Sequence, residues 1–324
     1  MLIGGSQRWC FPLLCFLLAG FAGGCATTRP APAATPAGAG QIPQASPPAP
    51  SPQRPPRSPL PGDPWDPPDI DAEVPVPNAG PACSLPDVLD QAGKRVQELV
   101  SNLDRFTATE FVEHESVNRG GFGQTQTRRF AYAVSIGPGT GGYLSVQEFR
   151  SRVPNAEQFP DGVSTEGTPS QVLVFHPLYA GDFDMECEGL GNWQGQPAWQ
   201  VRFEQRRDRA NRLSNVISGN KMYSVRLRGR AWILADSYQV ARLETDLADP
   251  IPAIGLRLEH MSVEYRPVAF RGGQTELWLP ASVEMYVDFA GRQFYRKHTF
   301  TNFTLFSVDV NQQISGPPAA APPK

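Results

Sequence analysis

The spacing of apolar residues changes once along the folded part of this chain. Between Ser84 and Leu103 the apolar residues recur every three or four positions, which predicts one amphipathic helix. Ser84, Pro86 and Asp87 suit its first turn, because Ser caps free N–H groups and Pro is tolerated at that position. From Phe106 onward the period becomes two, which is typical of β-strands.

The region after the helix predicts a series of short strands joined by turns. Residues 171–179 are apolar and compatible with either a helix or a strand. Because no helix alternates with the strands, we predict a mostly β (α+β) fold: a large antiparallel sheet, curved or partly closed, with one N-terminal helix and few covering helices. The predicted strands are 106–115, 126–136, 143–152, 182–188, 197–205, 222–228, 230–236, 238–247, 256–265, 276–279, 282–289 and 293–308.

The segment 230–236 is apolar on both faces, with Trp232 and Leu234 on one face and Ala231 and Ile233 on the other. A strand that is covered on both faces lies in the middle of a sheet. We therefore expect a helix or a ligand to cover its second face.

Proline divides the chain into parts. Of its 34 prolines, 18 fall in residues 26–82, a composition that favours an extended spacer over a packed core. We predict that residues 25–82 form a disordered stalk that begins with a lipidated Cys, that residues 83–312 form one domain, and that residues 313–324 form a disordered tail.

The first 24 residues read as a signal peptide, because the apolar run from Phe11 to Phe21 is too short to span a membrane. Ala22-Gly23-Gly24-Cys25 resembles a bacterial lipobox, in which Cys25 receives the acyl chains; an ordinary signal peptide is the alternative. By the sorting rule of Gram-negative bacteria, Ala26 implies an outer-membrane lipoprotein, which we expect to face the periplasm.

The five cysteines reduce to one pair under this scheme. Cys10 and Cys15 leave with the signal peptide and Cys25 carries lipid, which leaves Cys83 and Cys187 in an oxidising compartment. We predict a disulfide between them; two buried thiols are the alternative.

Candidate chemistry is sparse, so we predict no enzyme, no catalytic residue, no metal site and no cofactor. No phosphate-binding loop, nucleophile elbow or zinc motif is present, and the acidic residues of segment 182–188 point the same way along a strand instead of converging. The four histidines are isolated in sequence, and His298 alone merits inspection. A net charge of −3 gives no basic excess for nucleic acid.

Residues 229–308 resemble outer-membrane lipoprotein-sorting proteins of the LolA, LolB and LppX type. The similarity lies in Gly229-Arg230-Ala231-Trp232-Ile233-Leu234, in Gln239-Val240-Ala241-Arg242-Leu243 and in Leu277-Trp278-Leu279-Pro280. The resemblance implies an incomplete barrel with helices over its concave face and acyl chains between them. This chain departs from the pattern at Leu234, near an expected acidic position.

Two functions follow as hypotheses. In the first, a membrane-anchored envelope lipoprotein binds or transfers a lipid or lipoprotein acyl chain. In the second, a filled domain of the same fold docks an envelope protein as a structural or sensory module. The candidate cavity residues for the first are Trp232, Leu234, Trp278, Val283, Met285 and Val287.

Overall fold

A computed structural model describes the folded part of the chain, and all the described residues belong to one compact unit. The predicted signal peptide, Cys25, the stalk up to residue 57 and the tail lie outside them, so those interpretations stay predictions. The described residues are 58–72, 77, 80–102, 106–139, 142–151, 159–209, 211–218, 220–270 and 276–305.

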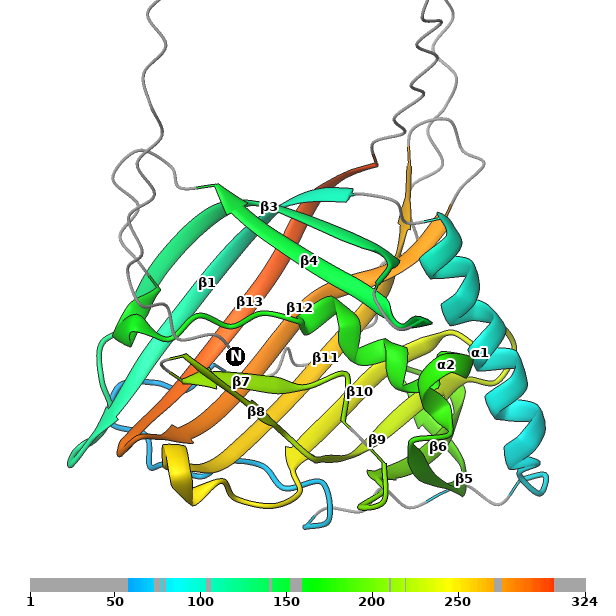
Figure 1. The fold of residues 1–324 in the computed structure, drawn as a ribbon, viewed down its shortest axis with the longest axis horizontal. Coiled ribbons are helices and arrows are strands. Elements are labelled where there is room, and N and C mark those ends of the chain that lie inside the picture. The colour runs from blue at the N-terminus through cyan, green and yellow to red at the C-terminus, as the bar shows by residue number, and fades with distance from the viewer. Residues whose placement is uncertain are drawn as a thin grey trace, which may run out of the picture. The chain divides into compact units, whose positions relative to one another are not determined.

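The domain is built on one large antiparallel sheet of 11 strands within the described residues, ordered β4-β3-β1-β13-β12-β11-β10-β9-β6-β5, with β2 paired to β1 (Figure 1). The edge strands β4 and β5 are not paired with each other, so the curved sheet stays open. The predicted mostly β fold is therefore confirmed. The strands are β1 (Phe106–Asn118), β2 (Gly121–Phe122), β3 (Gln126–Pro138), β4 (Leu144–Ser151), β5 (Phe183–Trp193), β6 (Gln196–Gln205), β9 (Leu227–Leu234), β10 (Val240–Leu247), β11 (Leu256–Ala269), β12 (Glu276–Phe289) and β13 (Arg292–Leu305).

Two strand predictions differ from the structure in an informative way. The predicted strand 222–228 belongs to two elements, because Lys221–Ser224 (β8) pairs with Asn215–Ser218 (β7) in a separate hairpin before β9 begins. The predicted strands 276–279 and 282–289 form the single strand β12. A shift of register beside Tyr265, the partner of Pro280, lets the sheet accommodate a residue without an N–H group.

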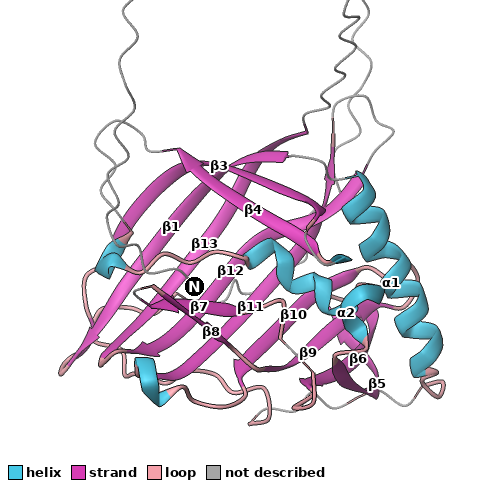
Figure 2. Cartoon of the chain, viewed as in Figure 1, coloured by secondary structure: helices cyan, strands magenta, loops and turns pink. Residues whose placement is uncertain are grey.

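Few helices cover the sheet, and the two longest helical segments lie side by side over one face of it (Figure 2). The predicted N-terminal helix is α1 (Leu85–Asn102), and residues 171–179 are helical: η3 (Thr168–Phe175) is followed by α2 (Pro177–Ala180). Short turns of 3-10 helix lie at η2 (Pro160–Gly162) and η4 (Pro252–Ile254). None of the helices in the described part of the chain is long and apolar enough to cross a membrane.

The predicted disulfide is confirmed: Cys83 and Cys187 are bonded, with their Cα atoms 6.2 Å apart. It ties Cys83, two residues before α1, to β5 at one edge of the sheet. Farther along α1, Gly93 packs closely on η3, where a Cβ atom would lie 3.2 Å from the carbonyl oxygen of Phe175. The helix is therefore held both covalently and by close packing.

The two faces of the sheet bury different residues. We call the face under α1 and η3 the concave face; it carries the main core, which includes Ala231, Ile233 and Val283. On the opposite, convex face, Trp232 and Leu234 pack in a smaller cluster with Trp193 and Trp278. Strand β9 is thus covered on both faces in mid-sheet, as its sequence predicts.

Residues 58–72 lie along the convex face, and we call them the strap (blue in Figure 1). The Trp65 ring packs on Phe122 and Tyr286, and Ile70 is buried, with its N–H donating to Asp246. The sequence places the strap in the disordered stalk; the structure places it against the domain. The physical reason is that Trp65 and Ile70 supply apolar contacts that the surrounding prolines do not.

Candidate ligand-binding cavity

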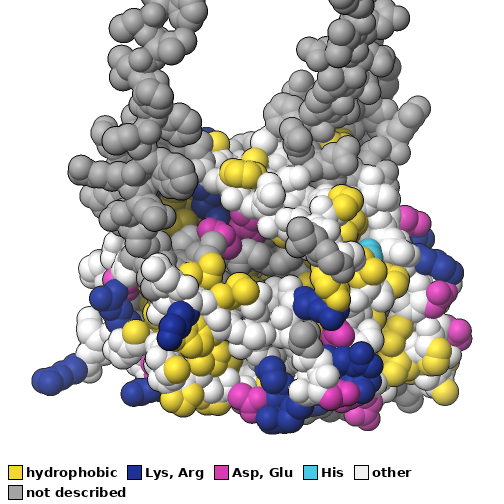
Figure 3. All heavy atoms as spheres, in the orientation of Figure 1, with side chains coloured by type: hydrophobic (Ala, Val, Ile, Leu, Met, Phe, Trp, Pro, Cys, Tyr) yellow, Lys and Arg dark blue, Asp and Glu magenta, His cyan; other side chains and the backbone are white. Residues whose placement is uncertain are grey.

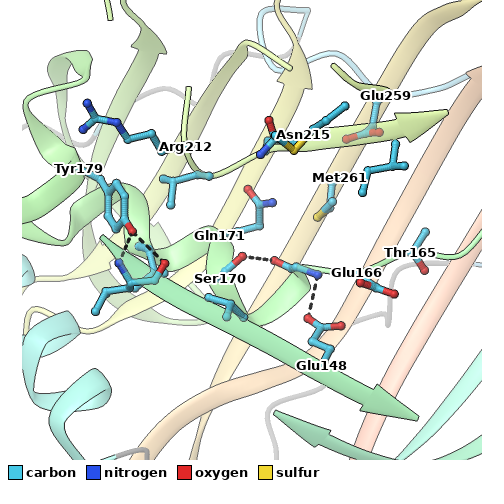
Figure 4. Close-up of a pocket in the computed structure, with 18 of the residues that line it drawn as sticks. Glu148, Thr165, Glu166, Ser170, Gln171, Tyr179, Arg212, Asn215, Glu259 and Met261 are labelled. Carbon is cyan, nitrogen blue, oxygen red and sulfur yellow. Dashed lines mark hydrogen bonds between the residues drawn. The ribbon is translucent and has the colours of Figure 1, made fainter. Parts of the chain in front are cut away.

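A cavity of about 280 Å³ lies between the concave face and the elements that cover it (Figure 4). Its walls come from β4, β11, β12 and η3, with the β7–β8 hairpin on the remaining side. The apolar part of the lining consists of Leu144, Val146, Leu173, Leu213, Ile217, Met222, Met261 and Met285.

The element η3 forms one wall, and the second half of its sequence is entirely apolar. The last four residues of η3, Val172 to Phe175, are all buried, because the helix lies between the sheet and α1. Gly167 begins it with φ of +83°, a left-handed conformation that favours glycine. The Gly167 N–H donates to Glu148 Oε1 at 2.8 Å, and Ser170 Oγ donates to the Gly167 carbonyl at 2.6 Å, which joins η3 to β4.

The β7–β8 hairpin forms the outer wall. Val216 anchors it in the core, whereas Met222, which also lines the cavity, is 69% exposed. Beside the hairpin, the Arg212 guanidinium lies 3.9 Å from the centre of the Tyr143 ring and 3.7 Å from the Asp182 carboxylate. Met222 therefore lies at the solvent-exposed rim of the cavity.

Three polar side chains reach the cavity from different elements: Glu148 from β4, Gln171 from η3 and Glu259 from β11 (Figure 4). All three are more than nine-tenths buried. Burial raises the pKa of both carboxyl groups, because a low-dielectric environment disfavours the charged form. Acidic side chains are also visible in the recess at the centre of this face (Figure 3).

Behind Glu148 the concave face buries an ion pair. Arg150 donates two hydrogen bonds to the Glu110 carboxylate, at 2.6 and 3.0 Å, and lies 3.3 Å from Glu148. His298 Nδ1 is 2.7 Å from Glu110 Oε1, and its Nε2 is 3.0 Å from the Thr165 hydroxyl. Although burial opposes ionisation of Glu110, His298 and Arg150 lower its pKa to about 2. Burial lowers the pKa of His298, so its neutral ring donates from Nδ1 and accepts at Nε2.

A second buried group holds the segment that leads into η3. Arg296 donates to the carbonyl oxygens of Val163, at 2.7 Å, and Pro160, at 3.2 Å. His114 lies 3.3 Å from Arg296 Nη2 through Nδ1 and 3.0 Å from Asp161 through Nε2. Burial and the charge of Arg296 lower the pKa of His114 to about 4, and burial lowers that of Arg296 to about 9. Arg296 therefore stays charged at neutral pH while His114 stays neutral.

The six predicted cavity residues separate by face. Met285 lines the cavity, and Val283 and Val287 lie in the main core on the same concave face. Trp232 and Leu234 lie in the convex cluster, and the partly buried Trp278 packs against both that cluster and the main core. The tryptophan-containing hairpin that carries the family resemblance thus turns its large side chains away from this cavity.

Sequence reasoning missed the polar residues of the concave face, apart from the attention drawn to His298. A signal was available, because Glu110 and His114 share the strand parity of Phe106, Ala108 and Val112. In β4 the same test is misleading: Glu148 is buried, whereas its apolar neighbour Phe149 is 59% exposed. Within the described residues no group of three or more His, Cys, Asp and Glu side chains is placed to hold a metal ion.

Comparison with known proteins gives structural neighbours alone. No family model and no curated protein matches the sequence. A DUF1329 family protein from Desulfovibrio piger aligns over 71% of this chain and 95% of its own, at 13% identity and a TM-score of 0.40. A LolA superfamily protein from Nitrosomonas europaea aligns over 70% and 96%, at 11% identity and a TM-score of 0.34.

An outer membrane lipoprotein-sorting protein domain from Vibrio parahaemolyticus aligns over 68% of this chain and 92% of its own, at 9% identity and a TM-score of 0.39. Two of these three neighbours belong to the group that the sequence resembles. At these identities and TM-scores the matches transfer no residue role and no function to this chain.

Proposed function

We propose that this chain is a membrane-anchored lipoprotein of the bacterial envelope whose domain binds an apolar chain of a lipid or lipoprotein without catalysing a reaction. The observation that carries the proposal is the cavity on the concave face, with Met261, Met285 and Leu173 in its lining. Burial of the ligand's apolar surface there would contribute about 25 cal/mol per Å².

The size of the cavity limits what it holds. Small-molecule sites range from roughly 300 to 1,000 Å³, so a cavity of about 280 Å³ is slightly smaller than that range. One chain of an amphiphile fits such a space better than a whole lipid with several chains. The exposed rim at Met222 leaves the remainder of a larger ligand outside the domain.

The anchor is part of the same proposal. Lipid on Cys25 would hold the chain to the outer membrane, facing the periplasm, and the proline-rich stalk would set its distance from the bilayer. Growth with labelled palmitate should label the native chain and leave Cys25→Ser unlabelled. Label retained in Cys25→Ser would contradict the assignment of Cys25.

Binding is tested on the full chain carrying Cys25→Ser, purified without detergent. Mass spectrometry of the native preparation should find a bound lipid, and the protein should take up a fluorescent acyl probe. Met261→Phe adds volume inside the cavity and should weaken uptake at least tenfold, whereas Leu234→Phe adds similar volume on the convex face and should leave uptake unchanged. Urea unfolding of both variants confirms that each is folded.

Absence of both lipid and probe uptake in the folded protein would overturn the proposal. That outcome leaves the alternative, in which the filled domain docks an envelope protein. Crosslinking in the cell envelope would then return one dominant protein partner.

A further inference from the structure

Buried acceptor atoms that lack a hydrogen-bond partner among the described residues line the cavity. Among the described residues, Glu259 Oε2 and Gln171 Oε1 have no hydrogen-bond partner, although both side chains are buried to 7% exposure or less. Buried acceptors without partners are costly, so such groups indicate a ligand or ion that donates hydrogen bonds. Glu148, on β4, accepts a hydrogen bond from the Gly167 N–H at Oε1, and its Oε2 lies 3.3 Å from Arg150 Nη1.

The charged groups around the cavity are predominantly acidic. Glu148, Glu166 and Glu259 line it, whereas Arg212 is the one basic residue among the described residues that line it. At the rim, Arg212 forms an ion pair with Asp182 and stacks on the Tyr143 ring. Arg150, behind Glu148, makes both of its short hydrogen bonds to Glu110. Glu148 therefore has Arg150 beside it, whereas no ion pair among the described residues includes Glu259.

Resting on the proposed lipid-chain binding, we propose that the polar end of the ligand in this cavity is a protonated amine. An ammonium group donates hydrogen bonds and carries one positive charge, which matches the partnerless acceptors of Glu259 and Gln171 and the acidic lining of the cavity. The apolar chain would lie along Met261, Met285 and Leu173.

The same geometry disfavours anionic ligands. A carboxylate or phosphate beside Glu259 offers no donor for Glu259 Oε2 or Gln171 Oε1, whereas a protonated amine donates to them and favours the ionised form of the Glu259 carboxyl group. A hydroxyl group offers a donor but no charge. Three ligands with one chain length and different ends therefore separate the contributions of charge, donor and chain.

The experiment measures displacement of the fluorescent acyl probe from the full chain carrying Cys25→Ser by dodecylamine, dodecanol and dodecanoate, each below its micelle concentration. Dodecylamine should bind at least tenfold more tightly than dodecanol, and dodecanoate at least tenfold more weakly. Glu259→Gln should reduce the preference for the amine to less than threefold while dodecanol binding is kept. Glu284→Gln, an acid on the neighbouring strand that pairs with Lys297 on the convex face, is the matched control and should keep the preference.

The outcomes separate the two proposals. Failure of all three ligands to displace the probe, together with no uptake of the probe, would overturn the proposed function. Equal binding of the three ligands, or tightest binding of dodecanoate, would keep lipid-chain binding and overturn the amine. Loss of the preference in Glu284→Gln as well as in Glu259→Gln would show attraction to the net charge of the whole chain, and would also overturn the amine.

Discussion

Two groups of ion pairs, one on each face of the sheet, differ in their exposure to water. On the concave face, Glu110 and Arg150 form an ion pair that is removed from water, with side-chain exposures of 0% and 8%. On the convex face, Arg228 pairs with Asp69 and Asp71 of the strap, and these side chains are between 28% and 49% exposed. The concave pair is surrounded by further polar partners, whereas the convex pair is shared with solvent.

This difference shows how each face is organised. On the concave face the charges tie β1, β4 and β13 to the segment that carries η3, so they position the wall of the cavity. On the convex face the charges hold a strap that is otherwise fixed by Trp65 and Ile70. We therefore expect loss of the Glu110–Arg150 pair to affect the stability of the whole domain and loss of the exposed Arg228 pairs to change it little. The convex face also buries one pair, Arg230 with Glu188, at side-chain exposures of 1% and 15%.

The largest effect is expected for Arg150→Met, which keeps the bulk of the side chain and removes its charge. It leaves Glu110 and Glu148 buried without their cation, and breaking a buried pair in this way costs about 3–5 kcal/mol. Urea unfolding monitored by tryptophan fluorescence gives the free energy of unfolding. A loss below 1 kcal/mol would mean that the two faces do not differ.

Removing the disulfide would show how far it holds α1 over the concave face. Replacing both Cys83 and Cys187 by Ser frees α1 from β5, and the loss of a native disulfide costs about 2–5 kcal/mol. Calorimetry of the double variant against the parent protein measures the change. An unchanged unfolding temperature would show that packing on η3 alone holds the helix.

The concave face should also show a response to acid. The folded state keeps His114 neutral down to a pH of about 4, its pKa, whereas the unfolded chain takes up that proton near pH 6.5. Protons therefore favour the unfolded state as the pH falls from 6.5 to 4, at a cost of about 3 kcal/mol. His114→Gln should reduce this loss in pH-dependent unfolding experiments, and a parallel pH profile in the variant would refute it.

A smaller loss of stability is expected when the strap is loosened. Ile70→Ala removes a buried side chain from the convex face and should cost about 2 kcal/mol, near the lower limit for such truncations, because the strap detaches without opening the core. Limited proteolysis should then cut within residues 58–72 while the sheet stays intact. Unchanged protease resistance would place the strap's main attachment elsewhere.

The smallest effect is expected for Arg228→Met, the convex counterpart of Arg150→Met. Ion pairs shared with solvent contribute at most about 1 kcal/mol, and salt weakens them further. The variant should therefore unfold at nearly the same urea concentration as the parent protein. A loss as large as that of Arg150→Met would remove the distinction between the two faces.

Much of the fold could be predicted from the sequence, because local spacing specifies local structure. The helical stripe before Leu103 became α1, the doubly apolar segment 230–236 became a strand in mid-sheet, and the count of cysteines identified the disulfide. The residues that line the cavity were harder to predict from the sequence. Strand alternation assigns Trp232 and Met285 to faces within their own strands, but it does not say which face is concave.

The sequence by itself determined the division into a proline-rich leader region and a β-rich domain, since composition and period act within short stretches of chain. The tertiary structure alone decided which polar residues meet inside the domain. Glu110 and His298 are 188 positions apart and lie 2.7 Å from each other, because β1 and β13 are neighbours in the sheet. Such contacts depend on strand order and curvature, and no local pattern encodes either of them.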